Sequence, residues 1–540
     1  MRSLFVLICS VVLLLVACSR VSTGTHPTNG NSSTVHGVVR YGITVDPNTL
    51  NPIVGSLGAE NAITEAIFSG LVKLDDRERL IPDLATEIPS LSNGGISADG
   101  RTITYHLRRG VRWQDGQPVT SADVAFTFAK IMDPSVNSPG SAPYTHVEKL
   151  TAPDDHTVVV RLKTPWAPAI GQLFCSGENG SIVPKHLLEH SVDFNRDPFG
   201  VHPVGSGAMR LARWDRGSRI VLVPNADYFG GAPKIKELDI IIVPDTNTIV
   251  TMLFAGELDA VATNAANQLG QLRSLHGYSV QLAPYTAVNY LAFNTTRQPF
   301  ADPHLRAALA LAVDRQRLVN TVYTGTALAA DSFIPPFSWA YDPHNGSLPY
   351  DPRLAGQSLT QDGWLMTADG VRARGDQKLS FTLLINSGSP RAAATAQEIQ
   401  QAWRAVGADV AIKALPLNVL YSPTGLLTTG KFDAALQNFI QDPDPDRSST
   451  LGSEFIGTRG ANSARYASAT SDALAAQAAS VYPHAGRKPL YAQLQRLWNR
   501  DLPVLPIAWP EQIYVVNSDL RGFKPEPVNS DFWNIQDWSD

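Results

Sequence analysis

Two histidines and a glutamate lie close together in the segment His186-Leu-Leu-Glu-His190. On a helix, residues four apart share a face, so this spacing would place both imidazoles together with the carboxylate between them. The order His-x-x-Glu-His is that of the inverted zinc-protease motif, in which the imidazoles bind Zn²⁺ and the carboxylate acts as a base. Taken alone, the segment predicts a secreted zinc metalloprotease with His186, Glu189 and His190 at its centre.

A second set of polar residues is suited to binding rather than to catalysis. The loop Asn386-Ser387-Gly388-Ser-Pro-Arg391 lies between a predicted strand and a predicted helix, where α/β sheets bind ligands. Its backbone amides and the Arg391 guanidinium could meet a carboxylate. An exposed position at the start of a helix accounts for Arg391 equally well.

Other common chemistries are excluded by pattern and composition. The sequence holds no Gly-x-Ser-x-Gly elbow and no Walker loop, which removes the commonest hydrolase and nucleotide-binding classes. Lys and Arg number 44 against 49 Asp and Glu, giving a net charge of −5, and the basic residues are scattered. This distribution argues against binding of nucleic acid. No cofactor is predicted.

The amino-terminal residues predict export and lipid attachment. Arg2 precedes a short apolar run from Leu4 to Ala17, which is too short to cross about 30 Å of hydrocarbon as a helix. The run ends in Leu15-Val-Ala-Cys18, which matches the bacterial lipobox. We therefore expect a signal peptide over residues 1–17, acyl chains on Cys18 and a protein anchored to the outer side of the cell membrane. An ordinary secretory signal that ends in Cys by chance is the alternative.

Residues 18–37 are rich in Ser, Thr, Asn and Gly and lack apolar periodicity, so they are expected to form a flexible tether. The remaining residues exceed what one hydrophobic core usually serves, which predicts at least two lobes. Helix-like and strand-like segments alternate along them without a repeat or a second linker, as in an α/β protein.

Several elements can be placed individually. Residues 102–107 alternate between apolar and polar, which predicts a half-buried strand. The pair Thr120 and Asp123 forms a capping box that opens a helix, and Asp302-Pro303 opens another. Residues 379–385, 392–406 and 409–415 are expected to form a strand, helix and strand of a parallel sheet.

The residues also resemble a known family. The segment from Ser97 to Pro134, with its Asp-Gly-Arg-Thr-Ile-Thr-Tyr-His-Leu-Arg-Arg-Gly-Val-Arg-Trp-Gln-Asp-Gly core, is similar to the signature of the family 5 extracellular solute-binding proteins. These are the peptide-binding lipoproteins of ABC importers. Further matching segments follow in the family's order over the mature chain: Thr49-Leu-Asn-Pro52, Ile67-Phe-Ser-Gly-Leu-Val72, Pro203-Val-Gly-Ser-Gly207, Phe254-Ala-Gly-Glu-Leu-Asp259, Tyr290-Leu-Ala-Phe-Asn-Thr295 and Leu502-Pro-Val-Leu-Pro506.

The resemblance implies an α/β fold, the two-lobed periplasmic-binding-protein clamshell with mixed sheets. Lobe I would be discontinuous, built from residues 38–284 and 506–540 with an inserted subdomain over 57–203, and lobe II would cover 285–505. The implied function is that of a monomeric, non-enzymatic subunit that closes on short peptides and delivers them to an ABC permease and its ATPase.

Site residues also follow from the resemblance. In the family an Asp in the motif Asp-Tyr-Pro-Asp-Pro holds the ligand's ammonium, and here the corresponding residues are Gln441-Asp442-Pro-Asp-Pro. Either Asp442 supplies the charge or no salt bridge forms, and the run is also compatible with a solvated turn. The segment Val54-Gly55-Ser56-Leu57 corresponds to the family's cleft edge. Tyr144 and Trp403 are candidate walls, and Trp403 also fits a core position.

Three alternatives remain open at this level. Some relatives of the family carry haem or nickel chelates, so uptake of a metal complex is the binding alternative to peptide uptake. A lipoprotein that receives a ligand without serving an importer is a second alternative. The zinc protease is a remote third, because the segment around His186 resembles an ordinary helix of the family.

Overall fold

The computed structural model describes residues 31–177, 180–525 and 531–540. The predicted signal peptide and Cys18 lie outside these ranges. Within them, none of the helices combines the length and apolar character that crossing a membrane requires.

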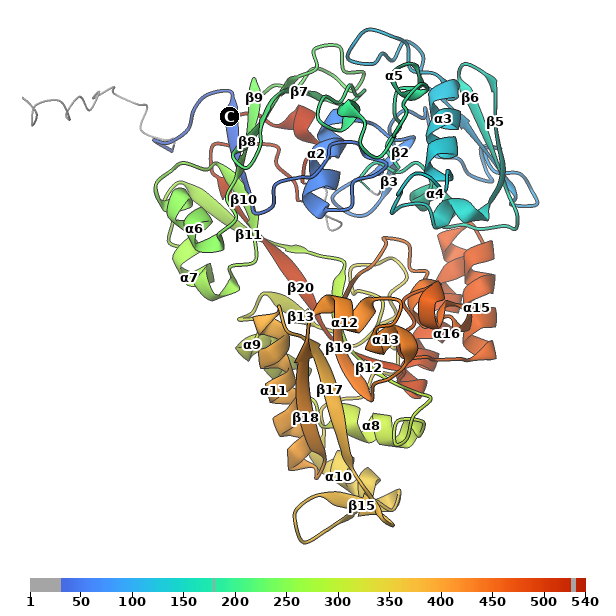
Figure 1. Ribbon diagram of the computed structural model, residues 1–540, viewed down its shortest axis with the longest axis vertical. Coiled ribbons are helices and arrows are strands. Elements are labelled where there is room, and N and C mark those ends of the chain that lie inside the picture. Colours follow the sequence, from blue (N-terminus) through green and yellow to red (C-terminus); the bar gives the residue numbers. More distant parts are fainter. Residues whose placement is uncertain (1–30, 178–179, 526–530) are drawn as a thin grey trace, which may run out of the picture.

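One mixed sheet of twelve strands runs through the molecule (Figure 1). Its order is β18-β17-β19-β12-β20-β10-β1-β9-β8-β7, and β11 and β13 also pair with β20. The strands are β1 Val38–Ile43, β7 Met209–Asp215, β8 Arg219–Pro224, β9 Glu237–Ile242, β10 Ala260–Thr263, β11 Tyr278–Pro284, β12 Ala287–Phe293, β13 Ala327–Ala329, β17 Ser380–Asn386, β18 Asp409–Leu415, β19 Ala434–Ile440 and β20 Val504–Asn517.

The long strand β20 joins the two lobes. Its first half pairs with β12, where Ala292 faces Val504, and its second half pairs with β11, where Tyr278 faces Asn517. Apolar clusters on one side of this junction form the first lobe, and those on the other side form the second lobe (Figure 1). The chain therefore passes between the lobes at the β11–β12 connection and again along β20.

The first lobe carries two further sheets and six described helices. Their bounds are β2 Val72–Leu74 with β3 Leu80–Pro82, then β4 Thr102–His106 with β5 Val147–Asp154 and β6 Thr157–Leu162, and helices α2 Gly58–Ile67, α3 Ser121–Ile131, α4 Ala169–Gln172, α5 Lys185–Leu188, α6 Thr246–Phe254 and α7 Leu269–Leu272.

The second lobe is more helical. It contains α8 Pro303–Leu311, α9 Arg315–Thr321, α10 Pro352–Gln361, α11 Pro390–Ala405, α12 Leu417–Tyr421, α13 Leu426–Thr429, α14 Ser448–Leu451, α15 Ala469–Ser480, α16 His484–Asp501 and a small sheet of β14 Leu365–Met366, β15 Arg372–Arg374 and β16 Gln377–Lys378.

The elements placed individually from the sequence are confirmed. In β4 the side chains of Ile103 and Tyr105 are buried while those of Thr102 and Thr104 are half-buried. The Asp123 carboxylate accepts the backbone N–H of Thr120 at 2.8 Å and closes the capping box of α3. Strands β17 and β18 are parallel and joined through α11, as predicted for the strand, helix and strand over residues 379–415.

The predicted tether is wrong at its carboxyl end. Residues 31–37 are bound to the first lobe: the backbone N–H of Asn31 and the Thr34 hydroxyl both donate to the Asp519 carboxylate, and Gly37 N–H donates to Asp540. A sequence rich in short polar side chains is usually predicted to be solvated. Here the polar groups of residues 31–37 form hydrogen bonds with carboxylates at the surface of the lobe instead.

A buried carboxylate organises the segment that precedes α2. One oxygen of Glu60 accepts the backbone N–H groups of Asn48 and Thr49, and the other accepts those of Ser56 and Leu57, at 2.7 to 3.3 Å. Glu60 is 1% exposed. These bonds hold residues 48–57 in one loop over the start of the helix.

We expect Glu60→Gln to lower the free energy of unfolding by about 1–3 kcal/mol. The NH₂ group of glutamine would face backbone N–H groups, which are also donors, so hydrogen bonds would be lost. Urea unfolding measures this. Glu257→Gln, at an exposed position, is the matched control and should leave the midpoint unchanged. Equal midpoints for both variants would contradict the role given to Glu60.

Candidate functional site

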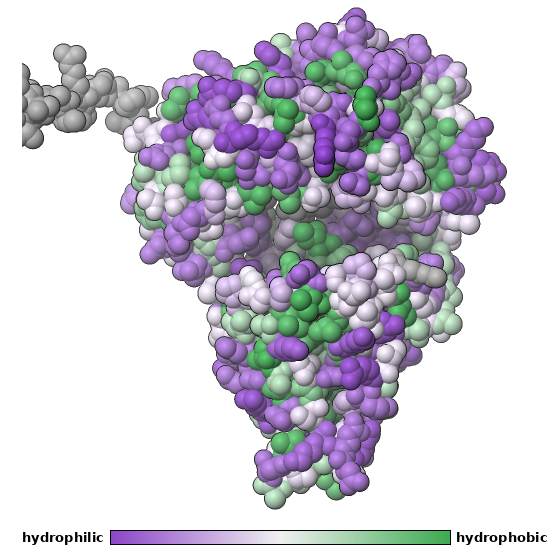
Figure 2. All heavy atoms as spheres, in the orientation of Figure 1, coloured by the Kyte–Doolittle hydropathy of each residue, from purple (hydrophilic) through white to green (hydrophobic). Residues whose placement is uncertain are grey.

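A cleft separates the two lobes. Figure 2 shows it as a hollow across the molecule, between the broad first lobe and the tapering second lobe. At its edge the lobes touch, since the Tyr482 hydroxyl donates to Gly100 O at 2.8 Å and the Ala167 N–H donates to Ala479 O at 2.6 Å. The cleft thus lies between these contacts and the strands that connect the lobes.

Two loops of the second lobe leave the sheet at the same edge. Strands β17 and β19 are parallel neighbours, with Leu383 paired to Ala434, so residues 386–391 and 441–447 both follow carboxyl ends. This edge faces the first lobe (Figure 1). In α/β proteins the carboxyl ends of parallel strands are where ligands bind.

The 441–447 loop is fixed by a buried ion pair. Both carboxylate oxygens of Asp444 accept from the Arg487 guanidinium at 2.7 Å, and Arg487 also donates to the Tyr491 hydroxyl at 2.8 Å. The two side chains are 13% and 2% exposed. Burial disfavours the charge of Arg487, but the facing Asp444 carboxylate outweighs this effect and raises the pKa of Arg487.

Arg447 lies inside the same loop. Its guanidinium donates to the backbone carbonyls of Asp444 at 2.6 Å, Asp446 at 3.2 Å and Asp442 at 3.3 Å. Burial lowers the pKa of Arg447, and the charge of Asp442 opposes that shift. These three hydrogen bonds connect the backbone of the loop to one buried side chain and so stabilise the conformation of the loop.

The structure distinguishes the two candidate anchors in this loop. Gln441 is 1% exposed, and its amide donates to Phe333 O at 3.3 Å, so it points into the second lobe. Asp442 is exposed, and its carboxylate accepts from Gln172 of the first lobe at 3.2 Å. The enclosing walls raise the pKa of Asp442 by desolvation, Arg447 lowers it, and Asp444 and Asp446 raise it further. Of the two, Asp442 is the residue whose side chain is exposed and contacts the other lobe.

The 386–391 loop presents a cation and backbone amides. Asn386 accepts the Gly388 N–H at 3.0 Å, and Ser389 caps α11 by accepting the Ala392 N–H at 3.1 Å. Ser387 and Gly388 are exposed. The Arg391 guanidinium lies 5.5 Å from the centre of the Tyr323 ring, and within the described part of the chain it forms no ion pair.

The segment Val54-Gly55-Ser56-Leu57 is the loop that Glu60 holds. Ser56 is exposed, Val54 and Leu57 are half-buried, and Gly55 is buried against Glu60. Among the described residues, this segment forms hydrogen bonds only within the first lobe. Its place at the cleft edge therefore stays a prediction.

Tyr144 and Trp403 are not walls of the cleft. Tyr144 is 1% exposed, and its hydroxyl accepts the Phe174 N–H at 2.9 Å. Trp403 is fully buried, and its indole N–H donates to Leu309 O at 2.9 Å. The polar group of each ring has a hydrogen-bond partner inside the core of its own lobe, as is usual for buried Tyr and Trp side chains.

The zinc-protease prediction is also wrong. Helix α5 ends at Leu188, so His186 and His190 do not share a helical face. His186 instead bonds Asp115 at 2.7 Å, and the His190 side chain is 90% exposed. The described residues contain no group of three or more His, Cys, Asp or Glu side chains placed to hold a metal ion.

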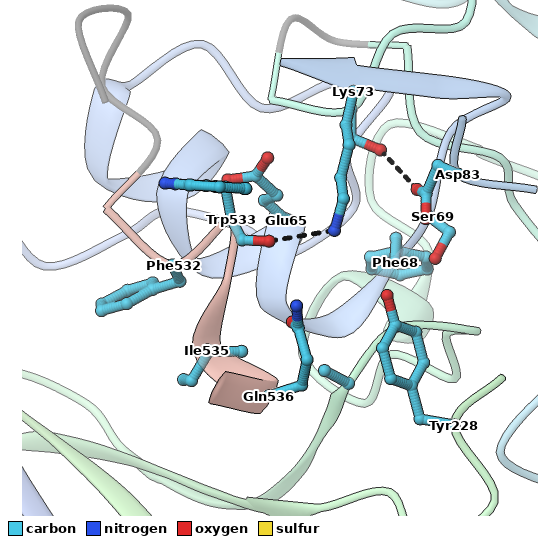
Figure 3. A pocket seen from close by; sticks show the side chains of 12 residues that line it. Glu65, Phe68, Ser69, Lys73, Asp83, Tyr228, Phe532, Trp533, Ile535 and Gln536 are labelled. Carbon is cyan, nitrogen blue, oxygen red and sulfur yellow. Dashed lines mark hydrogen bonds between the residues drawn. The ribbon is translucent and has the colours of Figure 1, made fainter. Parts of the chain in front are cut away.

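A small polar cavity lies inside the first lobe, away from the cleft loops (Figure 3). Lys73 donates to Trp533 O at 3.0 Å, and Asp83 accepts from Ser176 at 3.0 Å. The cavity measures about 10 Å³, which is room for about one water molecule. The bond from Lys73 links β2 to the carboxyl-terminal residues, and the cavity is too small for a solute.

The comparisons with known proteins agree with this architecture. Residues 79–457 match the family described as bacterial extracellular solute-binding proteins, family 5 middle. Protein XP55 of Streptomyces lividans is 30% identical over 509 residues, covering 93% of this chain and 88% of the relative. The oligopeptide-binding protein AppA of Bacillus subtilis is 25% identical and covers 99% of each chain.

Among solved structures, NikZ from Campylobacter jejuni in complex with Ni(L-His) superposes with a TM-score of 0.77 at 23% identity, covering 94% of this chain and 100% of that one. This likeness concerns the fold. The chain belongs to family 5 of the bacterial extracellular solute-binding proteins, and its fold is the periplasmic-binding-protein clamshell.

Removal of one partner of the buried ion pair should destabilise the second lobe. We expect Asp444→Asn to lower the free energy of unfolding by about 3–5 kcal/mol, because the Arg487 charge stays buried without its partner. Asp369→Asn, which breaks an exposed pair with Lys378, is the control and should leave the urea midpoint unchanged. If both variants unfold at the wild-type midpoint, the Asp444 pair does not hold the loop.

Proposed function

We propose that this protein captures short peptides in the cleft and delivers them to the membrane subunits of an ABC importer. The observation that carries the proposal is a pair of opposite charges on two loops at one sheet edge. Asp442, on one loop, is exposed and accepts from Gln172 of the first lobe, and Arg391, on the neighbouring loop, has no ion pair among the described residues. A peptide is a zwitterion whose ammonium and carboxylate need these partners when they leave water.

Closure follows from contacts that a bridging guest makes with both lobes. A peptide held by Asp442 in the second lobe and by the first lobe binds the closed state more tightly than the open one, which shifts the population toward closure. Backbone groups of an extended peptide contribute affinity that does not depend on sequence. No bond of the guest is made or broken in this account.

The relatives support a peptide as the solute. AppA is named as an oligopeptide-binding protein, and its match spans almost the entire length of both chains. The NikZ structure holds a nickel–histidine complex. We therefore treat a metal chelate, or haem, as the outcome that would contradict peptide binding.

The amino-terminal sequence supports the rest of the proposal. Cys18 would carry lipid and hold the protein as a monomer on the outer side of the cell membrane, beside the permease and ATPase. We place the lobe boundaries at 284/285 and 505/506. In support, the buried clusters of the first lobe reach Ala283 and resume at Ile513, apart from Ala479 at the contact between the lobes, while those of the second run from Val288 to Trp509.

Mass spectrometry of ligand released from denatured protein tests the solute class. The expected result is a mixture of short peptides, because backbone recognition tolerates different side chains. A single metal chelate, haem or no small molecule at all would contradict the proposal.

Two substitutions test the terminal anchors by calorimetry. Asp442→Asn and Arg391→Gln should each weaken peptide binding at least about tenfold, since each removes a hydrogen bond to a charged group. Arg391→Gln should lose its effect on a peptide whose carboxyl end is amidated. Asp376→Asn and Arg353→Gln, at exposed positions, are the charge-matched controls. If the two variants bind peptide with the same dissociation constants as the controls, Asp442 and Arg391 do not hold the peptide termini.

A further inference from the structure

The turn between α15 and α16 reaches from the second lobe into the first. Ala479, in the last turn of α15, is 9% exposed and belongs to the buried apolar cluster of the first lobe, and Tyr482 packs against the same cluster. The Ala167 N–H donates to Ala479 O at 2.6 Å. The Tyr482 hydroxyl donates to Gly100 O at 2.8 Å and, more weakly, to Trp166 O at 3.4 Å. Two residues of the second lobe are therefore part of the packing of the first.

The first-lobe turn that receives Tyr482 is fixed by contacts of its own. The Asp99 carboxylate accepts the Ser97 hydroxyl at 2.5 Å and the Arg101 N–H at 3.1 Å. Gly100 has φ 67°, in the left-handed region that glycine adopts readily. A Cβ atom at this position would lie 3.0 Å from the Tyr482 ring, so the ring packs directly on the glycine backbone. Because the turn is already ordered, it loses little entropy when the tyrosine docks.

These contacts lie on the other side of the cleft from the strands that join the lobes. Figure 1 shows α15 and α16 on the right, beside the first lobe, and the connecting strands β11 and β20 further to the left. When two lobes rotate about their connecting strands, the points far from those strands separate most. Opening of the cleft must therefore break the contacts of Ala479 and Tyr482, and closure must form them again.

The contacts of Ala479 and Tyr482 join two parts of the protein and include no atom of a guest. They therefore contribute the same free energy to the closed state whichever guest lies in the cleft. Burial raises the pKa of Tyr482 to about 12, so its hydroxyl keeps its proton at neutral pH and can donate. The contributions proposed for Asp442 and Arg391 differ in kind, because they depend on the charged ends of the guest.

We infer that the α15–α16 turn is a latch, which fastens the closed lobes through Ala479 and Tyr482 and slows the release of every guest by the same factor. The inference rests on the proposed peptide-binding function and deepens it. The latch would add affinity that does not depend on the side chains of the peptide, as a protein that accepts varied peptides requires. We expect the protein without a guest to be mainly open, and the guest and the latch together to shift the population to the closed state.

Stopped-flow fluorescence with two peptides of different side chains, Ala-Ala-Ala and Ala-Phe-Ala, tests the inference. Tyr482→Phe removes the hydroxyl and keeps the ring. For both peptides we expect this variant to raise the dissociation rate about fivefold, which corresponds to the loss of one hydrogen bond from the closed state. The association rate should stay unchanged, because a guest enters the open state. Tyr482→Ala, which also removes the ring, should raise the dissociation rate further.

Tyr341→Phe is the matched control, because the Tyr341 hydroxyl donates to the Asp331 carboxylate at 2.7 Å within the second lobe. It should leave both rates at their wild-type values. A wild-type dissociation rate in Tyr482→Phe, or a faster rate for only one of the two peptides, would overturn the inference and leave the proposed peptide binding intact. Failure of every peptide to bind the wild type would overturn the proposed function together with the inference.

Discussion

The free-energy cost of burying a charge without a partner governs the design of the cleft. The charged groups that fix the 441–447 loop are satisfied inside the second lobe. Asp444 and Arg487 neutralise each other, and Arg447 is surrounded by backbone carbonyls of the loop that it supports. In the proposed function Asp442 and Arg391 pair with a charged solute, and a solute that also contacts the first lobe would favour the closed state.

The second lobe and the first lobe contribute to this cleft in different ways. The second lobe presents its loops from the carboxyl ends of β17 and β19, where the parallel register places them side by side. The first lobe contributes the end of α4, from which Gln172 reaches Asp442. A guest that binds one set of groups alone gains little from closure, whereas a guest that binds both stabilises the closed state.

Local periodicity and capping patterns predict much of the fold. The capping box of α3, the alternation of β4 and the β17–α11–β18 unit form as their sequences indicate, because each depends on neighbouring residues. The resemblance to the family supplied the two-lobed architecture, which no local pattern contains. Residues 31–37 escaped prediction because their partners, Asp519 and Asp540, lie at the other end of the chain.

The candidate site was less accessible to sequence. Tyr144 and Trp403 look alike whether they line a cleft or a core, and only their contacts with Phe174 N–H and Leu309 O place them in cores. The choice between Gln441 and Asp442 depends on the direction of the 441–447 loop, which Arg447 within it and the distant Arg487, through Asp444, determine.

Small-angle X-ray scattering on ligand-stripped protein, before and after addition of a bound peptide, tests the central claim most directly. The account predicts a decrease in the radius of gyration at saturation, with the change following the binding curve, and no decrease for Asp442→Asn at the same peptide concentration. An unchanged radius of gyration in wild-type protein that demonstrably binds peptide would contradict closure by a bridging guest.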